Sequence, residues 1–129
     1  MYKDLWESKI RYHVDKGTEL VTIGEKRELP FRISVIGENA INILRMAING
    51  VSEMNFFMLV TSMKRFAAKG ILSKDYSIYL EKAYEFHRGE TYIGSGEEQF
   101  SFDEVRDIFN EICILVQEVE AYLKQEGKL

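Results

Sequence analysis

The chain is poor in residues that break or cross-link a fold. Its 129 residues contain one proline, Pro30, and one cysteine, Cys113. A lone cysteine forms no disulfide within the chain, and its use fits a reducing compartment. Apolar residues surround Cys113 in the sequence and provide no nearby cation to lower the pKa of its thiol. We therefore expect a buried, unreactive thiol.

Long apolar runs are also missing. No segment approaches the roughly 20 apolar residues of a membrane helix, and the opening MYKDLWE carries no signal-peptide core. We therefore expect a cytoplasmic protein without a membrane partner. The net charge of −4 also argues against broad binding to a duplex backbone, which requires clustered Lys and Arg. Sequence-specific recognition of duplex DNA is accordingly not expected.

Helical periodicity dominates the chain after Pro30. Apolar residues recur at helical spacing through ISVIGENAINILRMAI. The dipeptide Asn49-Gly50 supplies a stop, because glycine adopts the left-handed conformation without a steric penalty. The sequence therefore predicts a long helix between the proline and Gly50.

Two further helices are predicted between residues 52 and 88. Ser52 is the expected cap of the first, which ends at Lys69-Gly70 and is apolar around more than half of its circumference. A helix this apolar is typical of the centre of a bundle, where it packs against more than one neighbour. Ser73 is the expected cap of the second, which runs to about Arg88.

The last helix has the clearest start signal. Ser101 and Glu104 form a capping box, in which the side chain of each bonds the backbone amide of the other. Phe100 and Val105 flank the box as a hydrophobic staple. The apolar stripe that follows is continuous and comprises Val105, Ile108, Phe109, Ile112, Leu115, Val116, Val119, Tyr122 and Leu123.

Residues 1–29 leave two structures open. Trp6, Ile10 and Val14 recur at four-residue spacing, as in a helix that stops at Gly17. The segment IRYHVDKGTELVTI also alternates like the two strands of a hairpin around its Asp-Lys-Gly turn. The sequence therefore predicts a single all-α domain over residues 1–129. Its expected architecture is an antiparallel four-helix bundle over residues 33–126, with an N-terminal extra helix or short β-hairpin.

Few residues offer catalytic or metal chemistry. The two histidines, His13 and His87, have no second metal ligand at helical spacing. The segment Gly94-Ser95-Gly96 lacks the lysine and the preceding strand of a phosphate-binding P-loop. No nucleophile elbow is present. We therefore expect no metal, no cofactor and no catalytic residue.

The end of the third predicted helix is the best candidate for a binding site. Arg88 can recognise a phosphate through its planar guanidinium, and His87 is a donor of a type that titrates near neutral pH. Tyr84 and Tyr92 add aromatic rings, which stack on a base or pack in an interface. Cations at a helix C-terminus also have a purely structural explanation, because the helix dipole stabilises them. We predict that these four residues form a ligand- or partner-binding patch.

Three features give the chain a resemblance to the HEPN superfamily of small helical bundles. They are a helix that closes on FAAKGILSKD, a helix that ends in Phe86-x-Arg88, and a loop that leads into a long amphipathic last helix. The resemblance covers residues 33–125. It implies a homodimer. In active members it also implies RNA cleavage, by an arginine and a histidine a few residues later that meet at the dimer interface.

The catalytic part of this resemblance is incomplete. Arg88 matches the arginine, but the positions that require histidine hold Ile93, Gly94 or Ser95, which do not serve in proton transfer. His87 precedes the arginine instead of following it. The resemblance therefore implies a non-catalytic binding or assembly module, a homodimer that binds a nucleotide or a second protein. The alternative is a HEPN-like ribonuclease, using Arg88 with His87, or a toxin-system component.

Overall fold

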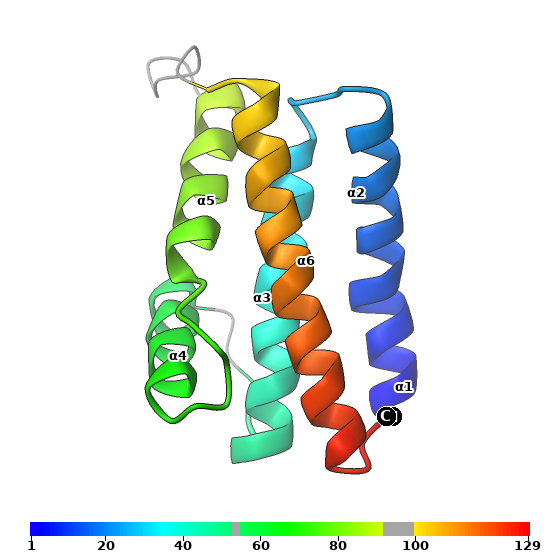
Figure 1. Ribbon diagram of the computed structural model, residues 1–129, viewed down its shortest axis with the longest axis vertical. Helices are drawn as coiled ribbons and strands as arrows, with labels where there is room; N and C mark the ends of the chain where they lie inside the picture. The colour runs from blue at the N-terminus through cyan, green and yellow to red at the C-terminus, as the bar shows by residue number, and fades with distance from the viewer. Residues whose placement is uncertain (53–54, 92–99) are drawn as a thin grey trace.

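The structure is a computed structural model that describes residues 1–52, 55–91 and 100–129 (Figure 1). All regular structure within these ranges is helical, which confirms the prediction of an all-α fold. The elements are α1 (Tyr2–Leu5), the π-helical η1 (Trp6–Arg11), α2 (Tyr12–Thr22), α3 (Leu29–Asn49), α4 (Phe56–Ala68), α5 (Ser77–Thr91) and α6 (Phe102–Gln125).

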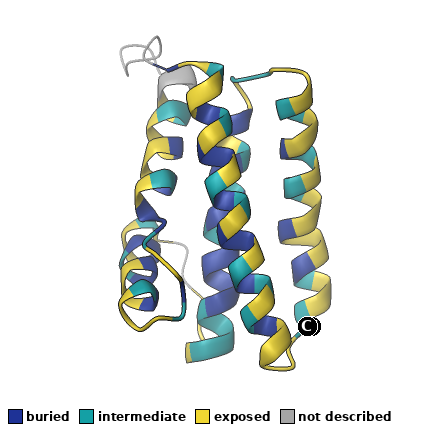
Figure 2. Cartoon of the chain, in the orientation of Figure 1, coloured by how far each residue is buried: buried dark blue, intermediate teal, exposed yellow. Residues whose placement is uncertain are grey.

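Helix α3 lies at the centre of the bundle. It contacts η1, α2, α4, α5 and α6, and it appears as the buried middle of the molecule in Figure 2. In Figure 1, α2 and α5 flank α3 on opposite sides, and α6 crosses in front of it. The prediction that the helix after residue 52 is central is therefore wrong. That helix, α4, is short, packs against α3 and α5, and leaves Phe57 73% exposed.

The N-terminal segment is a helix, so the hairpin alternative is wrong. The elements α1, η1 and α2 follow one another without a break, and together they form one long arm of the bundle (Figure 1). The predicted stop at Gly17 is also wrong, because the helix continues to Thr22, and Gly24 with its positive φ of 72° follows. Gly17 serves close packing instead: it is buried directly against the ring of Phe109 in α6.

Helix α3 begins and ends close to where the sequence predicts. Pro30 lies in its first turn, where the missing backbone N–H has no intrahelical partner to lose. Gly50 ends it with φ 76°, as predicted. One side of α3 is buried and apolar, and this side comprises Ile33, Ile36, Ala40, Ile43 and Leu44.

The caps predicted for the next two helices are wrong. Helix α4 is capped by Asn55, whose side-chain oxygen accepts a hydrogen bond from the backbone N–H of Met58 at 3.2 Å. Helix α5 begins at Ser77, whose backbone N–H donates to Asp75 at 2.9 Å. Asn55 lies three residues nearer its helix than the predicted Ser52, and Asp75 lies two residues nearer than the predicted Ser73. A polar side chain next to the first turn is better placed to accept a hydrogen bond from a free backbone N–H there.

Ser73, which was expected to cap α5, binds α6 instead. Its backbone N–H and its hydroxyl each donate to the carboxylate of Glu118 at 2.7 Å, and the buried Tyr76 hydroxyl donates to the same carboxylate. Burial raises the pKa of Glu118, but the hydrogen bonds from Tyr76 and Ser73 outweigh it and leave that pKa below its ordinary value. This carboxylate ties the α4–α5 connection to α6 and fixes where α5 begins.

Helix α6 matches its prediction closely. Both hydrogen bonds of the capping box are present, from the N–H of Glu104 to the hydroxyl of Ser101 at 3.2 Å and from the N–H of Ser101 to the carboxylate of Glu104 at 3.4 Å. Every residue of the predicted stripe is buried except Tyr122, which is half-buried. Cys113 is half-buried, not buried as expected. Burial nevertheless raises the pKa of its thiol to about 11, which agrees with the expectation of an unreactive thiol.

The close approach of α2 to α6 predicts that Gly17→Ala destabilises the fold. A Cβ at Gly17 would overlap Cε1 of Phe109 and lie 2.9 Å from Cζ of the same buried ring. Overpacking of this kind costs about 1–3 kcal/mol, more than the gain of about 1 kcal/mol that alanine brings to a helix interior. Urea denaturation should therefore show a lower free energy of unfolding.

Gly37→Ala is the matched control. Its Cβ would lie 2.9 Å from Cδ1 of Leu80, the mobile end of a flexible side chain, so a small rotation relieves the contact. We expect a smaller decrease in the free energy of unfolding than for Gly17→Ala. A Gly17→Ala variant as stable as the wild type would show that α2 and α6 are farther apart than described.

Candidate functional site

Three of the four predicted site residues lie on one side of α5. Tyr84, His87 and Arg88 are spaced by three and four residues and so share a helix face. The ring of Tyr84 is 45% exposed, His87 is half-buried and Arg88 is exposed. Tyr92 lies outside the described residues.

Two aromatic residues from other helices join these three. The ring of Phe56, the first residue of α4, lies 5.2 Å from that of Tyr84 at an interplanar angle of 30°. The ring of Phe31, in the first turn of α3, lies 5.6 Å from the His87 ring and is 44% exposed. The five side chains form what we call the aromatic–cation strip, which comprises Phe31, Phe56, Tyr84, His87 and Arg88.

The sequence holds only a weak signal for the two added residues. Phe31 follows the proline and falls outside the apolar period of α3, so it is an aromatic residue on a side where a soluble helix usually carries polar ones. Phe56 belongs to the apolar helix that was expected at the centre of the bundle. Its place in the strip depends on where α4 begins. The cap predicted at Ser52 would start this helix earlier than the structure does.

The strip can stack on a planar group and attract an anion. The Arg88 guanidinium lies 5.9 Å from the centre of the Tyr84 ring, within the range of a cation–π contact. Phe56 supports the same ring from α4. His87 contacts Phe31, an apolar ring that neither accepts nor returns a proton. The arrangement therefore offers aromatic surface and positive charge.

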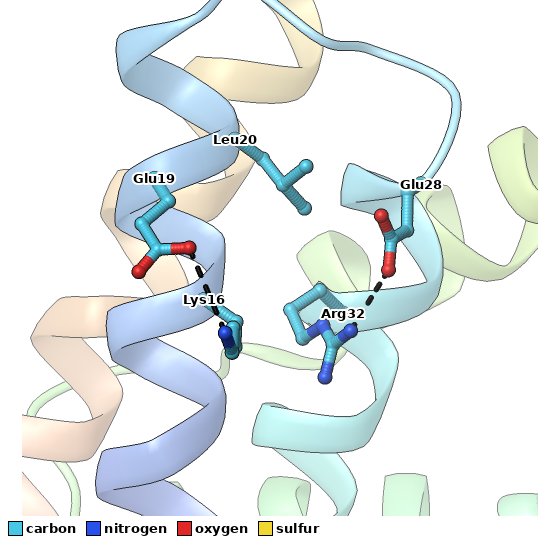
Figure 3. A pocket seen from close by; sticks show the side chains of 5 residues that line it. All are labelled: Lys16, Glu19, Leu20, Glu28 and Arg32. Atoms are coloured by element: carbon cyan, nitrogen blue, oxygen red, sulfur yellow. Dashed lines mark hydrogen bonds and ion pairs between the residues drawn. The ribbon is translucent and has the colours of Figure 1, made fainter.

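A polar cleft lies between α2 and α3, next to the strip (Figure 3). It has a volume of about 300 Å³ and is lined by Lys16, Glu19, Leu20, Glu28 and Arg32. Its charges pair along each helix: Lys16 with Glu19 at 3.8 Å on α2, and Arg32 with Glu28 at 2.8 Å on α3. Both cations therefore already have partners, and the cleft carries no excess charge for a ligand.

Arg32 also connects the cleft to His13 and to the strip. Its Nη1 donates to Nδ1 of His13 at 2.7 Å, and its guanidinium carbon lies 5.8 Å from the centre of the Phe31 ring. Burial lowers the pKa of His13, and the positive charges of Arg32 and Lys9 lower it further. The imidazole is therefore neutral near pH 7, and its Nδ1 accepts the hydrogen bond from Arg32.

Comparison with known proteins assigns no family to the chain. No family model matches it, and neither the curated proteins nor the solved structures give a significant match. Along the described residues, no helix has both the length and the apolar character of a membrane span. The same residues contain no cluster of His, Cys, Asp and Glu that could hold a metal ion.

The His13–Arg32 contact predicts that stability falls with mild acid. The unfolded chain takes up the His13 proton near its ordinary pKa of 6.5, whereas the folded chain does so only at lower pH. The contribution of His13 is therefore complete above pH 6.5 and is lost as the pH falls from there to the folded-state pKa.

His13→Gln retains an acceptor for Arg32 and does not titrate. The melting temperature of this variant should fall less than that of the wild type between about pH 7.5 and about pH 5. The comparison at matched pH removes the effect of the other titrating groups. Identical pH profiles for the two proteins would contradict the described contact.

Proposed function

We propose that the protein is a non-catalytic helical binding module, a homodimer that binds a nucleotide through the aromatic–cation strip. The observation that supports this function is the Tyr84 ring, which is 45% exposed and contacts both Phe56 and Arg88. A tyrosine in this setting loses little freedom when a ligand binds, because its neighbours already fix its orientation. A second protein is the alternative occupant of the same surface.

The chemistry of the strip favours a ligand that combines a planar ring with an anion. A base stacks on an exposed tyrosine ring, and each such stack contributes about 1–3 kcal/mol. Arg88 is exposed and adjacent to that ring, so it can pair with the phosphate of the same nucleotide. The strip covers a small area, so it suits one nucleotide or a short single strand better than a duplex, in keeping with the net charge of −4.

The absence of a histidine after Arg88 supports a non-catalytic role. The HEPN-like signature would require one at Ile93, Gly94 or Ser95, positions that lie outside the described residues. The His87 ring contacts the Phe31 ring. This contact does not favour His87 as the proton-transfer partner of Arg88 in phosphodiester chemistry. The ribonuclease alternative would need a proton-transfer group from elsewhere, for example from a second subunit.

Nucleotide binding is tested with Tyr84→Ala and Arg88→Gln. Tyr84→Ala removes the stacking surface and should weaken binding of a fluorescent single-stranded RNA about 10- to 100-fold, as expected for loss of about 1–3 kcal/mol. Arg88→Gln removes the charge, so its effect should shrink as salt is raised. Ile114→Ala, at a 41% exposed position on α6, is the control and should bind like the wild type.

Fluorescence anisotropy with the RNA and with AMP as competitor measures these affinities, and a gel shows whether the RNA stays intact. A wild type that binds neither probe would contradict the nucleotide proposal. Cleavage of the RNA at any pH from about 6 to about 8, lost in Arg88→Gln, would favour the ribonuclease alternative. Intact RNA with the expected loss of binding supports the binding module.

A further inference from the structure

The cleft between α2 and α3 holds its four charges in an order that places like charges at the same end. The two helices run antiparallel and are joined by residues 23–28 (Figure 1). Glu19 and Glu28 lie at the end of the cleft nearest this connection (Figure 3). Lys16 and Arg32 lie three and four residues farther away, which is about one helical turn. The cleft therefore has an acidic end and a basic end.

The two ion pairs of the cleft behave as two parallel dipoles. The cation precedes the carboxylate in α2, at 3.8 Å from it, and follows the carboxylate in α3, at 2.8 Å. Because the helices are antiparallel, both pairs point in the same direction. Parallel dipoles side by side repel each other, and a dipole of opposite orientation between them is attracted to both. The cleft therefore suits a ligand that is neutral overall and carries separate positive and negative groups.

The charged side chains are accessible to such a ligand. Lys16 is 43% exposed, Glu19 is 69% exposed and Glu28 is 52% exposed. Arg32 retains 14% of its exposure. Exposed ion pairs within one helix contribute little to stability, so these groups exchange part of their mutual contact for a ligand at small cost.

Both cations are held from outside the cleft. Nζ of Lys16 lies 5.7 Å from the centre of the Tyr12 ring, and Nη1 of Arg32 donates to Nδ1 of His13 at 2.7 Å. Neither Tyr12 nor His13 is part of the cleft lining. These contacts restrict the two cations before a ligand arrives, and this lowers the entropy that binding costs.

The size of the cleft matches one small molecule. Its volume of about 300 Å³ is at the lower end of the range for small-molecule sites. In an α-amino acid the amine nitrogen and the carboxyl carbon are about 2.5 Å apart, a spacing close to that of the ion pairs on the two helices. Leu20 adds an apolar side chain that points from α2 into the cleft (Figure 3).

We propose that this cleft binds a free α-amino acid with an apolar side chain. The carboxylate of the ligand pairs with Lys16 and Arg32 at the basic end. Its ammonium pairs with Glu19 and Glu28 at the acidic end, and its side chain contacts Leu20. This site is separate from the aromatic–cation strip, and the inference does not rest on the proposed function.

Three related ligands test the need for both charges. Isothermal titration calorimetry should show that L-leucine binds the wild type with a dissociation constant of about 1 mM or lower. Isocaproate has the same carbon skeleton and carboxylate but no ammonium, and leucinamide has the ammonium but no carboxylate. Each should bind at least about 10-fold more weakly than leucine, because each leaves one end of the cleft without a partner.

Two variants assign the ends of the cleft. Lys16→Gln and Glu19→Gln each remove one charge and keep a polar side chain of similar length, and each should weaken leucine binding about 10-fold. Glu19→Gln should also reduce the preference for leucine over isocaproate, since the ammonium then gains less. Lys82→Gln is the matched control for Lys16→Gln: the lysine is exposed on α5, on the other side of α3, and its loss should leave leucine binding unchanged.

The contradicting outcomes are equally specific. A wild type without saturable binding of leucine up to about 10 mM overturns the proposal. Isocaproate or leucinamide that binds as tightly as leucine overturns it as well, because one end of the cleft would then suffice. Equal losses in Lys16→Gln and Lys82→Gln would show an effect of net charge alone and contradict the site.

The ligand comparison on the wild type is decisive even if a variant does not fold, which circular dichroism detects. Tyr84→Ala should bind leucine like the wild type, and Lys16→Gln should bind RNA like the wild type. The amino-acid site and the nucleotide site can therefore fail independently of each other.

Discussion

The packing of α3 against five neighbouring elements is the constraint on which the rest of the structure depends. Its buried isoleucines and leucine hold α6 across one side, and α2 and α5 flank it. Gly37 of α3 lies against both of these neighbours, since a Cβ there would be 2.9 Å from Cδ1 of Leu80 in α5 and 3.6 Å from Cδ1 of Ile112 in α6. On the side opposite the apolar stripe, Glu38 is half-buried, and Nε and Nη1 of Arg45 are buried without a hydrogen-bond partner among the described residues.

The aromatic–cation strip follows from the same arrangement. The Glu118 carboxylate holds the connection before α5 against α6, and α5 then runs alongside α3 as far as Phe31. This brings Tyr84, His87 and Arg88 beside aromatic rings from α3 and α4. The rigid helices fix the orientation of these side chains, and the exposed ring and guanidinium suit a planar anion.

Local sequence signals predicted the helices well, but they did not predict which helices pack against each other. The capping box at Ser101 and the left-handed Gly50 are properties of short segments, so the sequence alone located them. Gly17 was interpreted as a stop because a glycine that serves packing and one that ends a helix are identical in sequence. The difference lies in Phe109, which is remote in the chain.

The same limit applies to the candidate site. Tyr84, His87 and Arg88 share one helix, so their spacing was enough to group them. Phe31 and Phe56 were missed because their roles depend on which helices become adjacent.

Native mass spectrometry of the wild-type protein, purified gently from the lysate of its own host, tests the central claim most directly. The account predicts the mass of two chains, with additional mass that corresponds to a bound nucleotide or short RNA. The mass of one chain without ligand at micromolar concentration would contradict it.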